Sequence, residues 1–213
     1  MRKNPGKIVV VAGTNGAGKS VIAGEMTAAH RLAYLNPDEL AKVLMATGKS
    51  REEANAIAWR FGYEGLRNAV DRNENFALET TLGGESIAAE LHRAARLNRE
   101  VHILYVGLSS VDLHIQRVHA RVARGGHDIP EQKIRERYVK SMVNLLGLVG
   151  KIASLQVFDN SEESSTGVPR AKLVLRMKGK RIVEPDRRTL LLNTPDWAKP
   201  IVAKALRERG APA

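Results

Sequence analysis

Eight residues near the start of the chain, Gly13 to Ser20, match the spacing Gly-x-x-x-x-Gly-Lys-Ser. Glycines in this pattern let the backbone wrap around a phosphate group with its N–H groups turned inward, and the N-terminus of a following helix adds partial positive charge. Lys19 is then expected to reach the β- and γ-phosphates of a nucleotide, and the Ser20 hydroxyl to bind Mg²⁺. The predicted nucleotide-binding residues are Asn15, Gly16, Ala17, Gly18, Lys19, Ser20 and Val21.

A first carboxylate, Asp38, follows a short apolar stretch at residues 33–35, in the run Asn36-Pro37-Asp38-Glu39. In open α/β sheets, ligands bind outside the carboxyl ends of the strands. A carboxylate at that edge can face the γ-phosphate and accept the proton of an attacking hydroxyl, as a general base must. We therefore predict a catalytic and substrate-binding role for Asp38, ahead of Glu39. The alternative is that Asn36 or Asp38 caps a helix.

A second carboxylate, Glu79, ends the apolar run at residues 75–79 and precedes Thr80 and Thr81. The same rule places these three side chains at the same edge of the sheet. We predict that all three bind substrate, and that Glu79 could also help to hold Mg²⁺ through water. The alternative is that Glu79 only starts a turn.

Three arginines, Arg117, Arg121 and Arg124, have i, i+4, i+7 spacing and therefore share one helix face. A Gly-Gly hinge follows them, and the next helix carries Arg135. Arginines on a movable loop are what phosphoryl transfer uses to neutralise charge on the transferring phosphate. We predict catalytic roles for Arg121 and Arg135 and a nucleotide contact for Arg124. The alternative for each is a solvated surface position.

Two further positions help to define the predicted site. Asn160 or Ser161, after the apolar run at residues 155–158, is predicted to contact the nucleotide base, with Asn160 preferred and a simple Asx-turn as the alternative. His127 is expected to form hydrogen bonds at the hinge rather than to catalyse. The run at residues 101–106 ends without an acid, whereas motor and switch ATPases hold Mg²⁺ with an acid there. This difference favours a small-molecule kinase over a translocase.

Apolar runs alternate with helical stretches, which predicts a parallel sheet covered by helices. The expected strands are residues 7–12, 33–35, 75–79, 101–106 and 155–158. The expected helices are residues 20–31, 38–45, 50–73, 86–97, 111–123 and 130–153, and Ser50 with Glu53 forms a capping box for the third. A hairpin at 171–177 and 181–183 and a closing helix at 196–209 are expected after the polar break at 161–167.

The length of 213 residues suits one domain, and a hydrophobic content of 43% is enough for a core. We expect a kinase core at residues 1–161, with a lid near 117–138, and a basic extension of the same domain at 162–213. The sequence has no cysteine, which excludes disulfides and thiolate metal sites. No apolar run approaches the ~18 residues of a membrane span. These features predict a soluble, cytoplasmic protein that does not bind membranes.

The charge of the chain is unevenly distributed. The net charge is +11, and residues 170–213 carry 12 Lys and Arg against 4 Asp and Glu, a difference of +8. A basic tail suits a nucleic acid, an acidic protein partner or only a solvated surface. Aromatic residues make up 4% of the chain, so the stacking platforms of single-strand binders are scarce. The composition therefore argues against nucleic acid as the main partner.

Taken in order, the motifs resemble the short form of the zeta-toxin family of bacterial P-loop kinases. The matching segments are residues 12–20, 36–39, 76–82, 117–127, 129–131, 134–138 and 158–161. The resemblance implies a kinase that uses ATP or GTP with Mg²⁺. The best-known members phosphorylate the 3′-hydroxyl of UDP-N-acetylglucosamine and so poison cell-wall synthesis. The resemblance therefore implies that this protein has UDP-N-acetylglucosamine as its acceptor, acts as a toxin and has an antitoxin protein as a partner.

The resemblance also implies roles and a fold. By motif position, Asp38 would be the base, Glu79 would contact substrate, and Lys19, Arg121 and Arg135 would hold the transferring phosphate. The implied fold is a three-layer α/β P-loop fold, in which a five-stranded parallel sheet of order 2-3-1-4-5 has helices on both faces. The C-terminal hairpin would be a small extension of it.

The acceptor itself stays open at this point. Only residues 83–99 separate the third and fourth strands, where the larger toxins carry a longer substrate region. An antibiotic or metabolite phosphotransferase would use the same carboxylates and arginines for any hydroxyl in line with the γ-phosphate. A module of a different class would bind nucleic acid through the basic tail in a nucleotide-dependent way, with steeply salt-dependent affinity.

Overall fold

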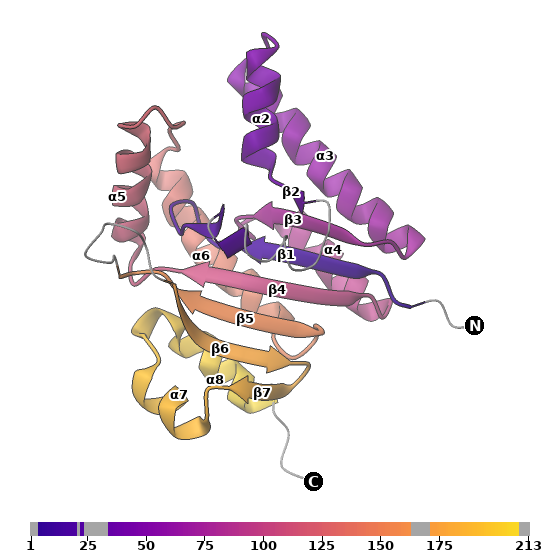
Figure 1. Cartoon of the computed structure of the whole chain (residues 1–213), viewed down its shortest axis with the longest axis vertical. Helices are drawn as coiled ribbons and strands as arrows, with labels where there is room; N and C mark the ends of the chain where they lie inside the picture. Colours follow the sequence, from indigo (N-terminus) through magenta and orange to yellow (C-terminus); the bar gives the residue numbers. More distant parts are fainter. Residues whose placement is uncertain (1–3, 21, 24–33, 163–170, 209–213) are drawn as a thin grey trace.

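The computed structural model describes residues 4–20, 22–23, 34–162 and 171–208. A sheet of seven strands runs through the molecule in the order β2-β3-β1-β4-β5-β6-β7 (Figure 1). The first five strands in this order are parallel, whereas β6 and β7 are antiparallel. The expected order 2-3-1-4-5 is therefore confirmed. The sheet is wider than five strands because the C-terminal hairpin pairs with β5 and continues it.

The strands lie close to the positions that the apolar runs predict. Their bounds are β1 Lys7–Ala12, β2 Tyr34–Leu35, β3 Phe76–Thr80, β4 Glu100–Gly107, β5 Ser154–Asp159, β6 Lys172–Lys178 and β7 Arg181–Glu184. Central β1 pairs Val9 with Ala77 of β3 and with His102 of β4. Every residue of β1 from Ile8 to Ala12 is buried. Since neighbouring residues of a strand point to opposite faces, both faces of β1 are covered, which explains its unbroken apolar run.

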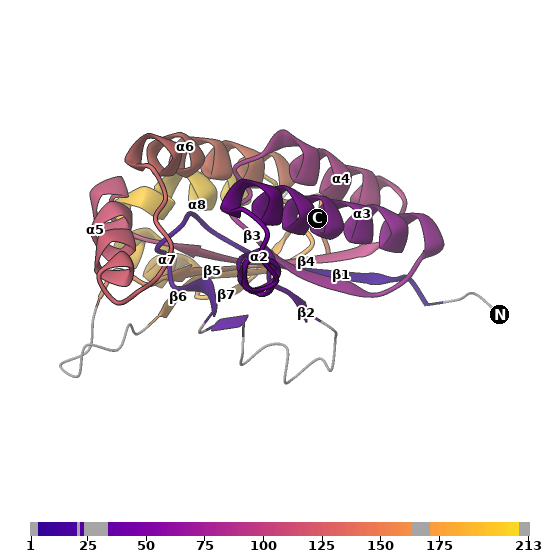
Figure 2. The ribbon, with the colours of Figure 1, turned by 90° about the horizontal axis from the view of Figure 1, so that it is seen from above.

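The described helices mostly cover one face of the sheet. They are α2 Pro37–Ala46, α3 Arg51–Arg72, α4 Glu85–Arg96, α5 Val111–Val122, α6 Glu131–Leu148, α7 Arg187–Asn193 and α8 Lys199–Glu208, with a 3-10 turn at Asp196–Ala198. Figure 2 shows α3, α4, α6 and α8 above the sheet. The hairpin of α2 and α3 projects past the sheet edge, and α5 stands beyond the carboxyl ends of the parallel strands (Figure 1). None of the helices in the described ranges is long and apolar enough to cross a membrane.

Local sequence explains where several helices begin and end. The predicted capping box is present, because Glu53 N donates to Ser50 Oγ at 3.2 Å and Ser50 N donates to Glu53 Oε2 at 3.0 Å. Helix α6 ends at Leu148 rather than at residue 153, and the left-handed Gly150 (φ 76°) then turns the chain towards β5. Helix α7 was not predicted, although Asp186 is an ordinary N-cap that accepts from two backbone N–H groups. Most of the helix expected at residues 20–31 lies outside the described residues.

The C-terminal segment packs against the carboxyl edge of the sheet, next to the phosphate loop. Trp197 is 8% exposed, and its ring lies so close to Gly107 that a Cβ at position 107 would overlap it. The Trp197 Nε1 donates to Asp159 Oδ1 at 3.2 Å. Trp197 also belongs to the main hydrophobic core together with Tyr105 and Ile201. The extension is therefore packed into the core beside the strands that carry the site.

Candidate functional site

The loop between β1 and Ser20 has the backbone shape that phosphate wrapping requires. Gly13, Gly16 and Gly18 have φ angles of 145°, 83° and 83°, a region that residues with a Cβ rarely adopt. A Cβ at Gly16 would also lie 2.6 Å from the His114 carbonyl oxygen. Both conformation and space therefore require glycine at this position of the motif.

Two buried side chains support this loop. His114 Nδ1 lies 2.8 Å from the Asn15 carbonyl oxygen, and since a carbonyl only accepts, Nδ1 carries the proton. Burial lowers the pKa of His114 to about 4, so the ring is neutral near pH 7. Asn160 is 2% exposed and donates from Nδ2 to the Ala17 carbonyl oxygen at 2.8 Å. Asn160, which we predicted to contact the base, thus uses its amide on the phosphate loop; His114 was missed, although it is a polar residue on the apolar face of α5.

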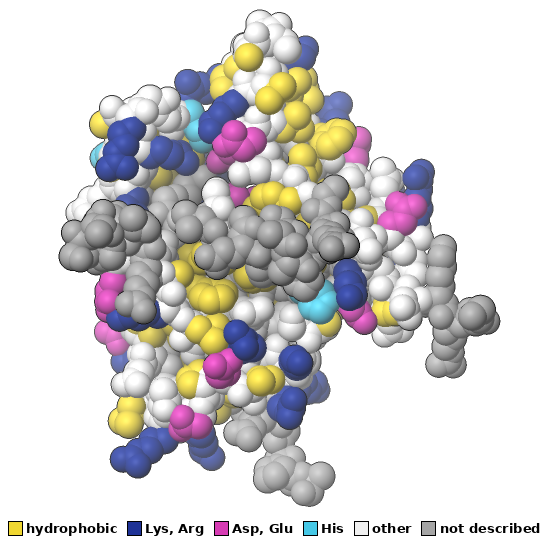
Figure 3. Space-filling model, viewed as in Figure 1, with side chains coloured by type: hydrophobic (Ala, Val, Ile, Leu, Met, Phe, Trp, Pro, Cys, Tyr) yellow, Lys and Arg dark blue, Asp and Glu magenta, His cyan; other side chains and the backbone are white. Residues whose placement is uncertain are grey.

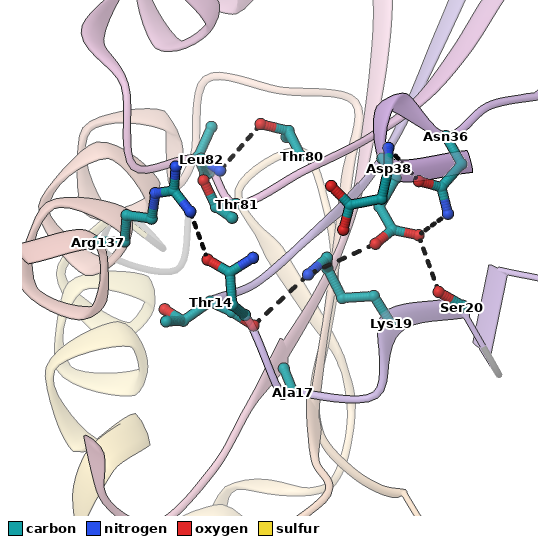
Figure 4. A network of polar contacts seen from close by, with 12 residues as sticks. Thr14, Ala17, Lys19, Ser20, Asn36, Asp38, Thr80, Thr81, Leu82 and Arg137 are labelled. Atoms are coloured by element: carbon teal, nitrogen blue, oxygen red, sulfur yellow. Dashed lines mark hydrogen bonds and ion pairs between the residues drawn. The ribbon is translucent and has the colours of Figure 1, made fainter. Parts of the chain in front are cut away.

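Lys19 and Glu79 form the centre of the site, and Figure 4 shows the polar contacts around Lys19. Both are buried, and the Lys19 Nζ lies 3.5 Å from Glu79 Oε1 and 3.5 Å from the Thr14 carbonyl oxygen. The Glu79 Oε2 accepts hydrogen bonds from Tyr34 OH at 2.8 Å, Asn36 Nδ2 at 3.2 Å and Ser20 Oγ at 3.3 Å. Burial and the charge of Glu79 raise the pKa of Tyr34, which keeps its phenol protonated as a donor. The carboxylate therefore holds the lysine, the predicted metal-binding serine and the α2 cap together.

The sequence left open whether Asp38 is a catalytic base or whether Asn36 or Asp38 caps a helix, and in the structure the two residues have different positions. Asn36 is the N-cap of α2, and its Oδ1 accepts from Asp38 N at 2.9 Å. The Asp38 carboxylate instead points into the interior of the site (Figure 4). The neighbouring Glu39 is exposed and pairs with Lys42 at 2.6 Å. Of the two acids, Asp38 therefore has the position that a base needs.

A cavity of about 830 Å³ opens beside Lys19 and Asp38. The phosphate loop, the β3 edge, the α2–α3 hairpin, the segment after the hinge and α6 all contribute side chains to it. The lining residues are Asn15, Lys19, Asn36, Pro37, Asp38, Arg51, Glu52, Asn55, Ala58, Trp59, Glu79, Thr80, Thr81, His127, Asp128, Ile129, Pro130, Lys133 and Arg137. The predicted substrate residues Glu79, Thr80 and Thr81 are thus brought together with Asp38. The Oγ1 atoms of Thr80 and Thr81 accept from Leu82 N and Gly83 N.

A second cavity, of about 810 Å³, lies between α2 and the arginines of α5. Ser20, Asp38, Arg117, Arg121 and Arg124 all line it. Arg117 and Arg121 lie one turn apart on α5, whereas Arg124, which we predicted on the same helix face, lies in the turn after the helix ends at Val122. The Arg121 Nη2 donates to the His127 carbonyl oxygen at 3.1 Å, whereas its buried Nε has no partner within the described part of the chain. Figure 3 shows Lys and Arg side chains gathered over the end of α5. This basic wall, next to Ser20, is suited to phosphate groups.

The structure places Arg135 away from this site and brings Arg137 to it. The Arg135 guanidinium pairs with Asp112 at 2.9 Å on the exposed surface, and Arg135 lines neither cavity. The Arg137 Nη1 donates to Asn15 Oδ1 in the phosphate loop at 2.8 Å (Figure 4). Arg137 therefore has the position that we predicted for Arg135. Val21, a predicted nucleotide contact, lies outside the described residues.

His127 has a more central place than a hinge hydrogen-bonder needs. It lines both cavities and lies near the charges of Asp38 and Arg121. Burial is the main cause that lowers the pKa of His127, although Asp38 opposes this effect. The imidazole is therefore neutral near pH 7 and can accept or donate a hydrogen bond beside Asp38.

The residues around Ser20 suit a Mg²⁺ ion that is shared with a nucleotide. The Ser20 hydroxyl and the Glu79 carboxylate are adjacent oxygen donors, and Mg²⁺ bound to nucleotides uses few protein ligands together with phosphates and water. The described residues contain no group of three or more His, Asp and Glu that could hold a metal ion alone. The donor set thus fits Mg²⁺ that arrives with phosphates.

Comparisons with known proteins agree with this geometry. Residues 8–140 match a family described as an AAA domain (AAA_33). An uncharacterised protein of Haemophilus influenzae is 30% identical over 132 residues, which cover 62% of this chain and 92% of the relative.

Two similar solved structures share the fold. The complex AvrRxo1-ORF1:-ORF2 with ATP has a TM-score of 0.61 and 16% identity; the match covers 90% of this chain and 64% of that one, less than two-thirds of its length. The PezAT toxin–antitoxin system of Streptococcus pneumoniae has a TM-score of 0.54 and 12% identity, over 98% of this chain and 87% of that one. The phosphate loop, the sheet order and the family match lead to one conclusion: the chain belongs to this AAA-domain family and has the α/β fold of P-loop kinases.

Proposed function

We propose that the protein is an ATP-dependent kinase that transfers the γ-phosphate to a hydroxyl of a small molecule. The observation that carries this proposal is that Asp38 and Lys19 line one cavity beside the phosphate loop. A general base must lie within reach of the hydroxyl that it deprotonates, and the P-loop lysine must reach the transferring phosphate. The ATP in the similar AvrRxo1 complex supports ATP as the donor.

In the proposed reaction, the acceptor hydroxyl lies between Asp38 and the γ-phosphate. Asp38 takes the hydroxyl proton as the new O–P bond forms, while the bond from the γ-phosphorus to the bridging oxygen breaks and ADP leaves with that electron pair. Lys19, Arg121 and Arg137 neutralise charge on the transferring group. The Ser20 hydroxyl and the Glu79 carboxylate would hold Mg²⁺, which would supply further neutralisation of the phosphates.

The acceptor that we propose is a sugar nucleotide such as UDP-N-acetylglucosamine, with a role as a toxin and an antitoxin protein as a partner. The motif resemblance to zeta toxins and the similarity to the PezAT toxin–antitoxin system support this choice. The cavity also suits it, because Arg51, Lys133 and Arg137 offer cations for a diphosphate.

Phosphorus NMR tests the proposal directly. ATP and Mg²⁺ are incubated with the protein, with and without UDP-N-acetylglucosamine, and we expect a new phosphomonoester signal only when all components are present. Lys19→Ala should abolish the signal because the phosphate contact is lost. Asp38→Asn should slow transfer by roughly 10²-fold or more while ATP still binds.

Glu39→Gln is the matched control for Asp38→Asn, because Glu39 is the adjacent acid on the exposed side of α2. Its transfer rate should stay close to that of the unmodified protein. An Asp38→Asn variant with a normal rate would remove Asp38 as the base. ATP binding without a phosphomonoester would reject the sugar nucleotide, and a metabolite extract would then be the next source of acceptors.

A further inference from the structure

Five residues of α3 line the 830 Å³ cavity, and the proposed transfer step uses none of them: Arg51, Glu52, Asn55, Ala58 and Trp59. Arg51, Asn55 and Trp59 are spaced at i, i+4 and i+8, so they form a stripe along one face of the helix. Trp59 is 52% exposed, so its indole is accessible from the cavity that it lines. The stripe thus lines the cavity with a cation, an amide and an indole in that order.

Tyr63 supports one face of the Trp59 ring. The two rings stack with their centroids 5.4 Å apart and their planes 6° apart. No other aromatic ring of the described residues stacks on the opposite face of this indole. A preorganised aromatic face at the wall of a polar cavity favours stacking by a planar ring of a ligand.

Arg51 supplies the second element of recognition. Its side chain is exposed and forms no ion pair within the described residues. Eight residues along a helix correspond to roughly 12 Å, so Arg51 and Trp59 are too far apart for one small group to contact both. Arginine is well suited to phosphate oxygens, and the Asn55 amide, between the two, can both donate to and accept from the edge of a ring.

We propose that the Arg51–Asn55–Trp59 stripe is the subsite that selects the acceptor, and that it selects molecules in which a planar heteroaromatic ring is joined to a phosphate group. The ring stacks on Trp59, its edge contacts Asn55, and the phosphate pairs with Arg51. This inference rests on the proposed kinase function, since binding at the stripe places the rest of the acceptor towards Asp38. It assigns acceptor choice to α3 and not to the short segment between β3 and β4.

A fluorescence titration tests the stripe without any transfer reaction. The phosphate loop is first saturated with a non-hydrolysable ATP analogue and Mg²⁺, and UDP, uridine or ribose 5-phosphate is then added. We expect UDP to quench the Trp59 emission, while the other tryptophan, Trp197, is 8% exposed and serves as an internal reference. Uridine and ribose 5-phosphate should each bind more weakly than UDP, because each lacks one of the two groups.

Variants with matched controls identify the residues involved. Trp59→Ala should weaken UDP binding, measured by calorimetry, by roughly 5- to 150-fold, whereas Trp59→Phe keeps a ring and should retain most of the affinity. Phe61→Ala is the control, because Phe61 is an exposed aromatic residue of the same helix outside the cavity. Arg51→Gln should weaken UDP but not uridine, and Arg60→Gln, on the same helix and outside the cavity, should change neither.

The proposal is overturned if Trp59→Ala binds UDP as well as the Phe61→Ala control does, if ribose 5-phosphate binds as tightly as UDP, or if no probe binds. The experiments also distinguish a wrong assignment of the stripe from a wrong assignment of the kinase function. If a ringless acceptor is phosphorylated in an Asp38-dependent way, the kinase stands and the stripe is rejected. If UDP binds at Trp59 but no acceptor is phosphorylated, the stripe stands as a binding site and the transfer step is rejected.

Discussion

Glu79 illustrates how one side chain can serve the phosphate loop in two states. Its carboxylate lies 3.5 Å from the buried ammonium of Lys19 and accepts three further hydrogen bonds. A bound phosphate would offer Lys19 a stronger counter-charge and leave the Glu79 oxygens near Ser20 for the metal. Glu79, one residue before the end of β3, therefore has a role in the phosphate loop in addition to the substrate contact that we predicted for it.

Glu79→Gln should destabilise the nucleotide-free protein, because it leaves the Lys19 charge buried without a partner; losing one member of a buried pair costs about 3–5 kcal/mol. ATP without metal should then raise the melting temperature of the variant more than that of the unmodified protein, since the phosphates restore a counter-charge. Thermal unfolding with and without ATP checks this. An equal or smaller shift would mean that Glu79 does not serve mainly as the partner of Lys19.

His114 predicts a pH dependence of stability. Its pKa is about 4 in the folded protein, against an ordinary value of 6.5, so below pH 6.5 the unfolded chain binds a proton that the folded protein does not. The free energy of unfolding should therefore fall as the pH is lowered from 6.5 to 4, with about 3 kcal/mol from this residue. In His114→Asn, which keeps a donor near the Nδ1 position, urea unfolding at several pH values should show a shallower loss. Identical slopes in the two proteins would contradict the assignment.

At the level of elements, the central strands β1, β3 and β4 were predictable because they are buried on both faces and read as apolar runs. It was not predictable which arginine of α6 reaches the site, because this depends on the rotation of the helix about its axis. Ile134 and Ser141 are buried, and Arg137 lies at i+3 from Ile134, whereas Arg135 lies next to it and turns about 100° away. The apolar spacing of α6 contained this information, and a helical wheel would have favoured Arg137.

The hinge after α5 gives a prediction at the same scale. A Cβ at Gly126 would lie 2.6 Å from Arg121 Cγ and 2.9 Å from the Arg121 carbonyl oxygen, so Gly126→Ala must displace the arginine that lines the basic wall. We expect a lower kcat, with a stability close to that of the unmodified protein. Gly84→Ser is the control, because a Cβ there meets nothing within 4 Å and serine suits its N-cap position. A normal kcat for Gly126→Ala would show that Arg121 does not depend on the hinge.

At the scale of the whole molecule, residues 171–208 are part of the support of the site. The hairpin widens the sheet, and Trp197 contacts Gly107 at the end of β4 and donates to Asp159 at the end of β5. The sequence predicted the hairpin from its turn, but it could not show this packing, because contacts between distant segments leave no periodic signal. The excess of basic residues in this region does not predict that Trp197 packs it against the sheet.

Trp197→Ala should lower the free energy of unfolding by about 3–5 kcal/mol, because a large buried side chain is lost and a cavity remains. It should also weaken nucleotide binding, since Val106 and Asn160, next to its contacts, touch the phosphate loop. Urea unfolding and an ATP titration check the two effects. Leu191→Ala, at an exposed position of α7, should change neither. Unaltered nucleotide affinity in Trp197→Ala would separate the extension from the site.

The contact between Trp197 and Gly107 also bears on the order in which the protein is made. The ribosome synthesises the phosphate loop long before Trp197; at about 5–20 residues per second the interval is roughly 10–40 seconds. During that time the carboxyl edge of the sheet lacks the contact with Trp197. A nascent chain would therefore gain full nucleotide affinity only after Trp197 has been synthesised and has packed against Gly107.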